Sequence, residues 1–125
     1  MFKEIIISTI IVITIVALDI VTQNYTNNAI SQTSTKLSEI KTMTNNKEET
    51  KDKVNETMSN WNSRKEKLAY FIEHDELEKV DTGLTNLKSY IDANDFTMIL
   101  SSIDETSYIL EHIKQKNSFS LINIF

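Results

Sequence analysis

The stretch Ile5-Ile-Ile-Ser-Thr-Ile-Ile-Val-Ile-Thr-Ile-Val-Ala-Leu-Asp-Ile-Val21 decides the architecture of the whole chain. Its first fourteen residues, 5–18, contain no charge, no glycine and no proline. As a helix with a rise of about 1.5 Å per residue, the run spans roughly 26 Å, a little less than a hydrocarbon core of ~30 Å. The length and the hydrophobicity predict that residues 5–21 form a transmembrane helix.

Two other interpretations of this run are weaker. A cleaved signal peptide needs a pair of small residues at its cleavage site, and the stretch from Ala17 to Thr22 offers none. A buried helix of a globular domain normally keeps a polar stripe, whereas this run is apolar on every face. We therefore expect an uncleaved signal anchor.

Positive charge sets the expected orientation. Lys3 precedes the run, and the next basic residue is Lys36. Because basic residues favour the cytoplasmic side, we expect residues 1–4 to be a short cytoplasmic end and residues 22–125 to lie outside the cell. The predicted localisation is a bacterial cell membrane, crossed once.

Composition limits what the remaining residues can be. The 125-residue chain has one glycine, no proline and no cysteine, which favours long helices and excludes disulfides and thiol chemistry. Its formal net charge is −5, and no basic stripe exists. A nucleic-acid partner is therefore not expected.

Apolar residues recur at helical spacing in four segments, separated by breaks at residues 45–46, 73–75 and 93–95. The four apolar stripes are Ile30, Leu37 and Ile40, with Thr26 and Thr33 on the same face; Val54, Met58, Trp61, Leu68 and Ile72; Leu77, Val80, Leu84, Leu87 and Ile91; and Phe96, Ile99, Leu100, Ile103, Leu110 and Ile113. They predict an all-α protein, in which the anchor helix continues into an antiparallel up-down bundle over residues 22–116.

The helix boundaries also have sequence signals. Asn46 with Glu49, and Asp75 with Glu78, have the spacing of capping boxes, so the second and third helices should begin near residues 47 and 75. The second helix is expected to end near Ile72. Residues 117–125 form an apolar tail, which can pack across the bundle or touch lipid; we favour packing.

Hairpin geometry places one polar layer at the membrane end of the bundle. Folding at residues 45–46 puts Gln23 beside Leu68, and folding at residues 93–94 puts residue 74 beside residues 112–113. The resulting layer contains Glu73, His74, Asp75, Glu76, Glu111 and His112.

This layer has two interpretations. His74, His112, Glu73 and Glu111 have side chains that ligate Zn²⁺ or another transition metal, although no His-Glu-x-x-His motif is present. The simpler interpretation makes Asp75 a helix cap and places His112 near the C-terminal end of its helix. The carboxylates are then solvated.

Asp19 and Asp75 are candidate contacts for a protein partner. An acid inside a membrane span is usually functional, but Asp19 lies three residues from the outer end of the run. It is therefore either solvated at the interface or paired with a partner helix.

Several segments resemble a known family: Tyr70-Phe-Ile-Glu-His-Asp-Glu-Leu-Glu-Lys-Val80, Tyr108-Ile-Leu-Glu-His-Ile113, Asn123-Ile-Phe125 and Leu18-Asp-Ile20. Over essentially its whole length, the chain resembles the small membrane-anchored clostridial proteins grouped as domain of unknown function 4363. The resemblance implies a bacterial envelope protein, with a neighbouring multi-span membrane protein as its partner. It implies no activity.

Among function classes, an enzyme would need a nucleophile with its base, a glycine-rich phosphate loop or a metal triad, and the sequence has none of these. A transmembrane sensor would need a second span or a cytoplasmic output, and only residues 1–4 precede the predicted anchor. We therefore expect a non-enzymatic interaction module or accessory subunit without a cofactor, in contact with lipid and with a multi-span membrane protein. The alternative is an extracytoplasmic four-helix module that binds a metal or senses a ligand. The oligomeric state is left open.

Overall fold

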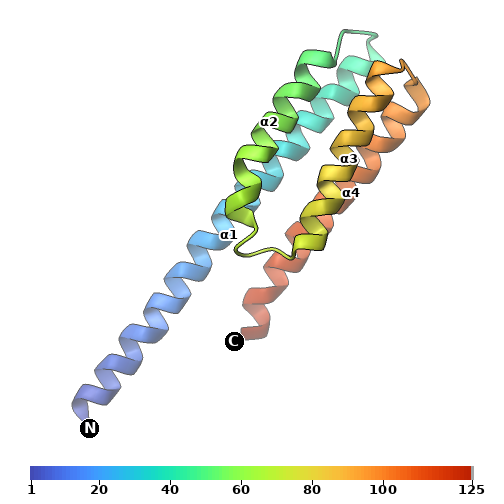
Figure 1. Cartoon of the computed structure of the whole chain (residues 1–125). Coiled ribbons are helices and arrows are strands. Elements are labelled where there is room, and N and C mark those ends of the chain that lie inside the picture. Colours follow the sequence, from blue (N-terminus) through green and yellow to red (C-terminus); the bar gives the residue numbers. More distant parts are fainter. Residues whose placement is uncertain (125) are drawn as a thin grey trace.

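The protein consists of four α-helices. A computed structural model describes the backbone of residues 1–124 and the side chains of residues 1–117. The helices are α1 (Phe2–Asn45), α2 (Lys51–Leu68), α3 (His74–Asp92) and α4 (Phe96–Ile124) (Figure 1). No strand occurs in residues 1–124, so the all-α prediction is confirmed.

The helices form a closed up-down bundle. Consecutive helices pack side by side, and α4 packs against α1 to complete the ring. The α1–α2 and α3–α4 connections lie at one end of the bundle, and the α2–α3 connection lies at the other (Figure 1). We call the end with the α2–α3 connection the anchor end, since the apolar half of α1 projects from it.

The predicted apolar stripes form the core. Most of their residues are buried: Ile30, Leu37, Ile40, Val54, Trp61, Leu68, Leu77, Val80, Leu84, Leu87, Ile91, Ile99, Ile103, Leu110 and Ile113. Thr26 and Thr33 are buried with them, as the stripe predicted. Met58 and Ile72 are only partly buried at its margin, and Phe96 is half exposed.

Helix α1 is one continuous helix with a buried part and an exposed part. Its 44 residues contain no glycine or proline that would break it. In the outer half every third or fourth residue is buried in the bundle, whereas the apolar half is exposed. Within that exposed half, the Thr9 and Thr14 hydroxyls donate to the carbonyls of Ile5 and Ile10 (2.7 and 2.8 Å). These two hydroxyls are thereby satisfied inside the helix.

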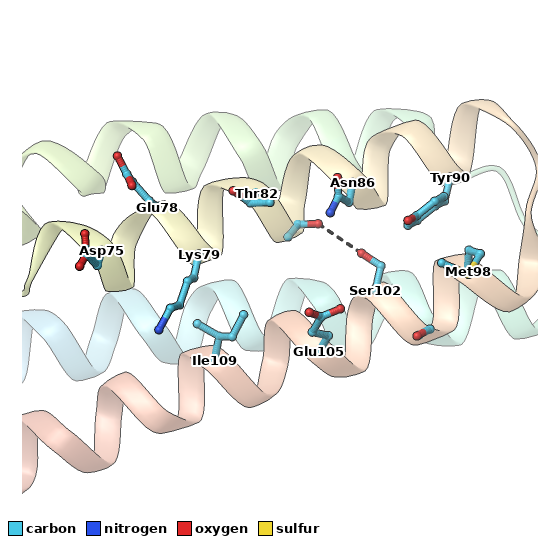
Figure 2. Close-up of a pocket in the computed structure, with 12 residues that line it drawn as sticks. Asp75, Glu78, Lys79, Thr82, Asn86, Tyr90, Met98, Ser102, Glu105 and Ile109 are labelled. Carbon is cyan, nitrogen blue, oxygen red and sulfur yellow. Dashed lines mark hydrogen bonds between the residues drawn. The ribbon is translucent and has the colours of Figure 1, made fainter.

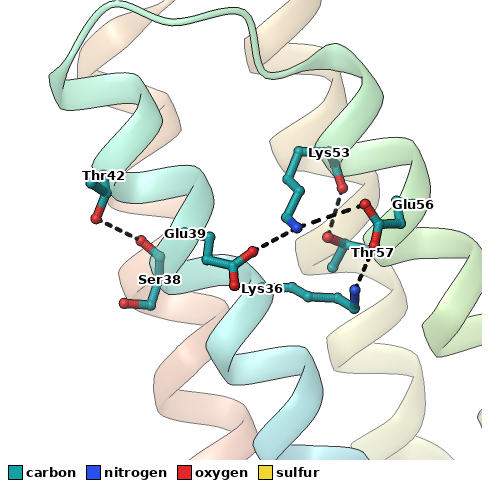
Figure 3. A network of polar contacts seen from close by, with 7 residues as sticks. All are labelled: Lys36, Ser38, Glu39, Thr42, Lys53, Glu56 and Thr57. Atoms are coloured by element: carbon teal, nitrogen blue, oxygen red, sulfur yellow. Dashed lines mark hydrogen bonds and ion pairs between the residues drawn. The ribbon is translucent and has the colours of Figure 1, made fainter.

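Ion pairs show the register of the first hairpin. Lys36 contacts Glu56 at 2.7 Å, and Lys53 contacts Glu39 at 2.6 Å (Figure 3). Both pairs lie within one residue of the register predicted from a turn at residues 45–46. Helices α1 and α4, which complete the ring, are also joined by the Lys41–Asp104 ion pair at 2.8 Å.

A polar triad joins α2 to α3. The indole Nε1 of the buried Trp61 donates to Asp81 Oδ1 at 2.7 Å, and Lys65 Nζ lies 2.9 Å from Asp81 Oδ2. Burying an indole N–H without a partner would be costly. Asp81 therefore allows Trp61 to occupy the core.

The predicted capping box at Asn46 is wrong. Lys47 has a left-handed backbone (φ 59°), and the N–H groups of Asn46 and Glu48 donate to the carbonyls of Thr42 and Met43. These residues therefore terminate α1, in the way that left-handed residues close helices. Helix α2 consequently begins at Lys51, four residues later than predicted, and it ends at Leu68, four residues earlier than predicted.

The second capping box is also wrong. Glu73 is the N-cap of α3 and makes no side-chain cap hydrogen bond, and Asp75 lies inside the helix. Glu78 instead contacts the His74 imidazole at 3.0 Å. At the other end of the bundle, the predicted turn at residues 93–95 is present, and Asp95 Oδ1 accepts a hydrogen bond from the Met98 N–H.

The backbone of residues 117–124 continues α4 to Ile124, so there is no break at the boundary predicted for the tail. The side chains of residues 118–125 lie outside the described residues. The prediction that this tail packs on the bundle concerns these side chains and so lies outside the described residues.

Candidate functional site

The α2–α3 connection, residues 69–73, forms the floor of the anchor end. Backbone hydrogen bonds from Tyr70 to Lys67 and from Phe71 and Ile72 to Leu68 continue the last turn of α2 before the chain reverses. The buried Leu68 holds this connection against the core from one side. The connection is therefore a tightly bonded turn.

A cavity of about 160 Å³ opens beside this connection, between α3 and α4. It is lined by Phe71, Ile72, Glu73, Glu76, Ile113, Lys116 and Asn117. A site for one water needs about 10–15 Å³ on this measure of volume, so the cavity has room for several waters or one small side chain.

Two polar groups of this cavity lack partners among the described residues. Glu76 is 7% exposed, and its Oε2 atom is buried without a hydrogen bond. Its other oxygen lies 3.7 Å from Lys79 Nζ. The Asn117 Nδ2 group is also buried without an acceptor. A guest that donates to Glu76 and accepts from Asn117 would relieve both desolvation costs.

An ion pair joins the two helices at this cavity. Glu73 Oε1, at the start of α3, lies 3.2 Å from Lys116 Nζ on α4, and both side chains are at least half exposed. This pair places the start of α3 beside residue 116 of α4, two or three residues farther along α4 than the hairpin counting predicted.

The predicted metal site is not assembled. No group of three or more His, Cys, Asp or Glu side chains in the described part of the chain is arranged to hold a metal ion. Glu73 pairs with Lys116, the exposed His74 pairs with Glu78, and Glu111 and His112 are exposed.

The physical reason is helix rotation. Successive residues of an α-helix point about 100° apart, and Ile113 of α4 is buried. His112 therefore points away from the core. Counting along hairpins fixes the height of a residue, but it does not fix the direction of its side chain.

The two candidate partner contacts lie in different places. Asp19 is half-buried on α1, with its Oδ2 atom buried and unpartnered among the described residues. Asp75 is exposed and lines a groove between α3 and α4. They do not form one site.

The α3–α4 groove has a volume of about 470 Å³ and is larger than the cavity at the anchor end (Figure 2). Ser102 Oγ donates to the Gly83 carbonyl at 3.2 Å between the two helices. Carboxylates of Asp75, Glu78 and Glu105 line the groove, together with Lys79. The groove is open and weakly acidic, and its carboxylates do not converge.

The hydroxyl hydrogen bonds of the described residues share one pattern. Each Ser or Thr hydroxyl bond that the structure shows ends on a backbone carbonyl, as at Thr33, Thr57 and Thr106. Apart from Ser102, which donates from α4 to α3, these hydroxyls donate within their own helices, and none of these bonds joins a hydroxyl to a side-chain base. The pattern is that of Ser and Thr hydroxyls satisfied by helix backbone carbonyls.

Sequence reasoning placed Glu76 in the polar layer without predicting its burial, and it missed Asn117. A signal for Asn117 was present, because residues 106, 110, 113 and 117 continue the apolar spacing of α4. The boundary predicted at residue 116 concealed it.

Comparison with known proteins gives one match. The family model described as Domain of unknown function (DUF4363) matches residues 20–124, which cover the whole bundle and begin at the outer end of the apolar run. No curated protein and no solved structure matches the chain.

Proposed function

Since the chain belongs to the family described as Domain of unknown function (DUF4363), which carries no assigned activity, we propose its function from its geometry. It is a membrane-anchored accessory subunit, which displays a helical bundle at the outer face of a bacterial cell membrane and acts by binding. It has no enzymatic activity of its own.

The exposed half of α1 carries this proposal. Among the described residues, α1 is the one helix long and apolar enough to cross a membrane, and its apolar window is not buried in the bundle. Eleven large apolar residues between Ile5 and Val21 are each at least half exposed. Each would gain roughly 1 kcal/mol or more from transfer into lipid, so the helix favours a membrane over water.

The charge distribution supports the orientation. Lys3 flanks the apolar run on one side, and the first basic residue on the other side is Lys36. Retention of Lys3 in the cytoplasm places the bundle outside.

The cavity at the anchor end supports a binding role. Its unpartnered Glu76 and Asn117 groups and its Phe71 and Ile113 side chains would accept a polar side chain on an apolar stem. Its place beside the membrane suits a partner that is itself a multi-span membrane protein. Asp19, at the outer end of the anchor, adds a polar contact for a helix of that partner.

Two experiments on the full chain in cells test this proposal, reporter fusions for the orientation and photo-crosslinking for the partner. Alkaline phosphatase fused after Phe125 should be active, and a cytoplasm-dependent fluorescent protein at the same place should stay dark. A photo-crosslinking residue at Lys116 should form an adduct with an integral membrane protein.

The matched control for crosslinking is Lys88, an exposed lysine of α3 that does not line this cavity. Equal adducts from both positions would contradict a binding site at the cavity. An inactive phosphatase with a bright fluorescent fusion would overturn the orientation.

A further inference from the structure

Two aromatic side chains are exposed at the anchor end. Tyr70 is 86% exposed and Phe71 is 43% exposed, and both lie in the α2–α3 connection. Exposed aromatic rings in water forgo the free energy that burial would give them. Both residues lie at the end of the bundle from which the apolar half of α1 projects, so their height relative to the proposed membrane span can be estimated.

A ring contact fixes that height. The Phe71 ring packs edge-on against Tyr25 of α1, with centroids 6.4 Å apart. Tyr25 follows Val21 by four residues, or about 6 Å along the helix. The predicted span ends at Val21, so Tyr25 lies about 6 Å beyond the hydrocarbon, within the headgroup layer of the bilayer. Phe71 therefore lies at the headgroup level.

The chemistry of this level suits the interface. Tyrosine combines an apolar ring with a polar hydroxyl, and such residues collect at the headgroup level of membranes. The Arg64 guanidinium lies 6.0 Å from the centre of the Tyr25 ring, so the same level carries a cation that suits lipid phosphates. The Glu73 carboxylate, which would repel them, is paired with Lys116.

We propose that Tyr70 and Phe71 insert into the interface of the same bilayer that α1 spans, as a second and peripheral membrane contact. This inference rests on the proposed anchor. With α1 as one attachment and the α2–α3 connection as another, the bundle stands upright and its anchor end sits directly on the lipid surface.

Two other exposed aromatics provide matched controls. Tyr108 is 74% exposed on α4, nine residues before Asn117, which places it about 14 Å farther from the membrane. Phe96 is 49% exposed and begins α4 at the opposite end of the bundle. The proposal predicts lipid contact for Tyr70 and Phe71 and water contact for both controls.

The experiment uses the absence of cysteine in the chain. Single substitutions Tyr70→Cys, Phe71→Cys, Tyr108→Cys, Phe96→Cys and Ile11→Cys are spin-labelled in the full chain, reconstituted in vesicles of phosphatidylcholine and phosphatidylglycerol. Collision with oxygen relative to a water-soluble nickel complex reports depth. We expect a several-fold higher ratio at residues 70 and 71 than at 108 and 96, and the highest ratio at residue 11.

The outcomes separate the two proposals. A lipid signal at residue 11 with a water signal at residue 70 would overturn the second contact and leave the anchor intact. A water signal at residue 11 would overturn the anchor itself. Equal lipid signals at residues 70 and 108 would mean that the bundle lies on its side. Tyr70 is the decisive position, because its exposure lets the label be added without disturbing the core.

Discussion

At the residue scale, Gly83 shows why one position of α3 carries no side chain. A Cβ atom placed there would collide with Oγ1 of Thr106 on α4, and Ser102 Oγ already donates to the Gly83 carbonyl. The two helices approach closely at this level because both surfaces are small. Glycine has a low helix propensity, and the close contact between α3 and α4 offsets this cost.

We expect Gly83→Ala to lower the free energy of unfolding by about 1–2 kcal/mol, because overpacking outweighs the gain in helix propensity. Urea unfolding of the full chain in mild detergent, followed by the fluorescence of the buried Trp61, measures it. Ser89→Ala, at an exposed position of the same helix, should change little.

Removal of the colliding hydroxyl tests the mechanism. Gly83→Ala combined with Thr106→Ala should be less destabilised than the sum of the two single variants. Strict additivity would show that the loss does not come from this contact.

At the element scale, the four charged residues Lys36, Glu39, Lys53 and Glu56 form ion pairs between α1 and α2. A hydrogen bond from Lys36 holds the pKa of Glu56 below its usual 4.5, with help from the charges of Lys36 and Lys53. A hydrogen bond to Glu39 holds the pKa of Lys53 above its usual 10.5, with the charges of Glu39 and Glu56 adding to it. The groups lie at the surface, so each contribution is small.

The directions of these pKa shifts predict the pH range of this stabilisation. The Glu56 contribution is complete above about pH 4.5 and is lost as the pH falls through the lowered pKa. The Lys53 contribution is complete below about pH 10.5 and is lost as the pH rises through the raised pKa. Tm should therefore be highest between these limits.

Glu56→Gln should lower Tm at neutral pH and reduce its fall in acid, since the variant has no carboxylate to protonate there. Calorimetry of the detergent-solubilised chain between pH 3 and 7, at low ionic strength, measures both effects. Glu66→Gln removes an exposed α2 carboxylate outside this network and should leave the acid profile unchanged. Identical profiles for the two variants would rule out a role for the network.

At the scale of the whole molecule, the continuity of α1 makes the anchor and the bundle one object. The helix runs from Phe2 to Asn45 without a break, and its outer half supplies a quarter of the bundle. On the proposed anchoring, the orientation of the bundle follows the orientation of the candidate membrane span. A flexible linker at the membrane surface would not transmit it.

We expect the far end of the bundle to stand about 30 Å above the lipid surface, the length of the 20 residues from Tyr25 to Asn45. Energy transfer from a dye at Asn46→Cys to acceptors on lipid headgroups measures this height. A Gly-Gly-Gly-Ser insertion after Val21 should lower the mean height and broaden its distribution, because it uncouples the bundle from the span. A height at residue 46 no greater than at residue 108 would contradict the upright arrangement.

The sequence by itself determined the all-α architecture, the up-down order and most of the core. The buried face of α3 follows from an apolar period of about 3.6 residues, and this periodicity is local information. The residues that show it are Leu77, Val80, Leu84, Leu87 and Ile91. The same holds for the candidate membrane span, because its length and hydrophobicity are properties of one continuous stretch. Heights along the bundle, such as that of Glu73 near Lys116 of α4, followed from short turns to within a few residues.

Only the tertiary structure decided the candidate site. Which oxygen of Glu76 is left without a partner depends on the rotation of α3 against α4, and a one-residue change in direction separates the buried Ile113 from the exposed His112. The start of α2 was misjudged for a related reason. The left-handed residue at Lys47 is selected by the closing hydrogen bonds of α1, which are not visible in the identity of the residue. Periodic burial is encoded along the chain, whereas the direction of polar side chains at helix ends is set by neighbours that are distant in sequence.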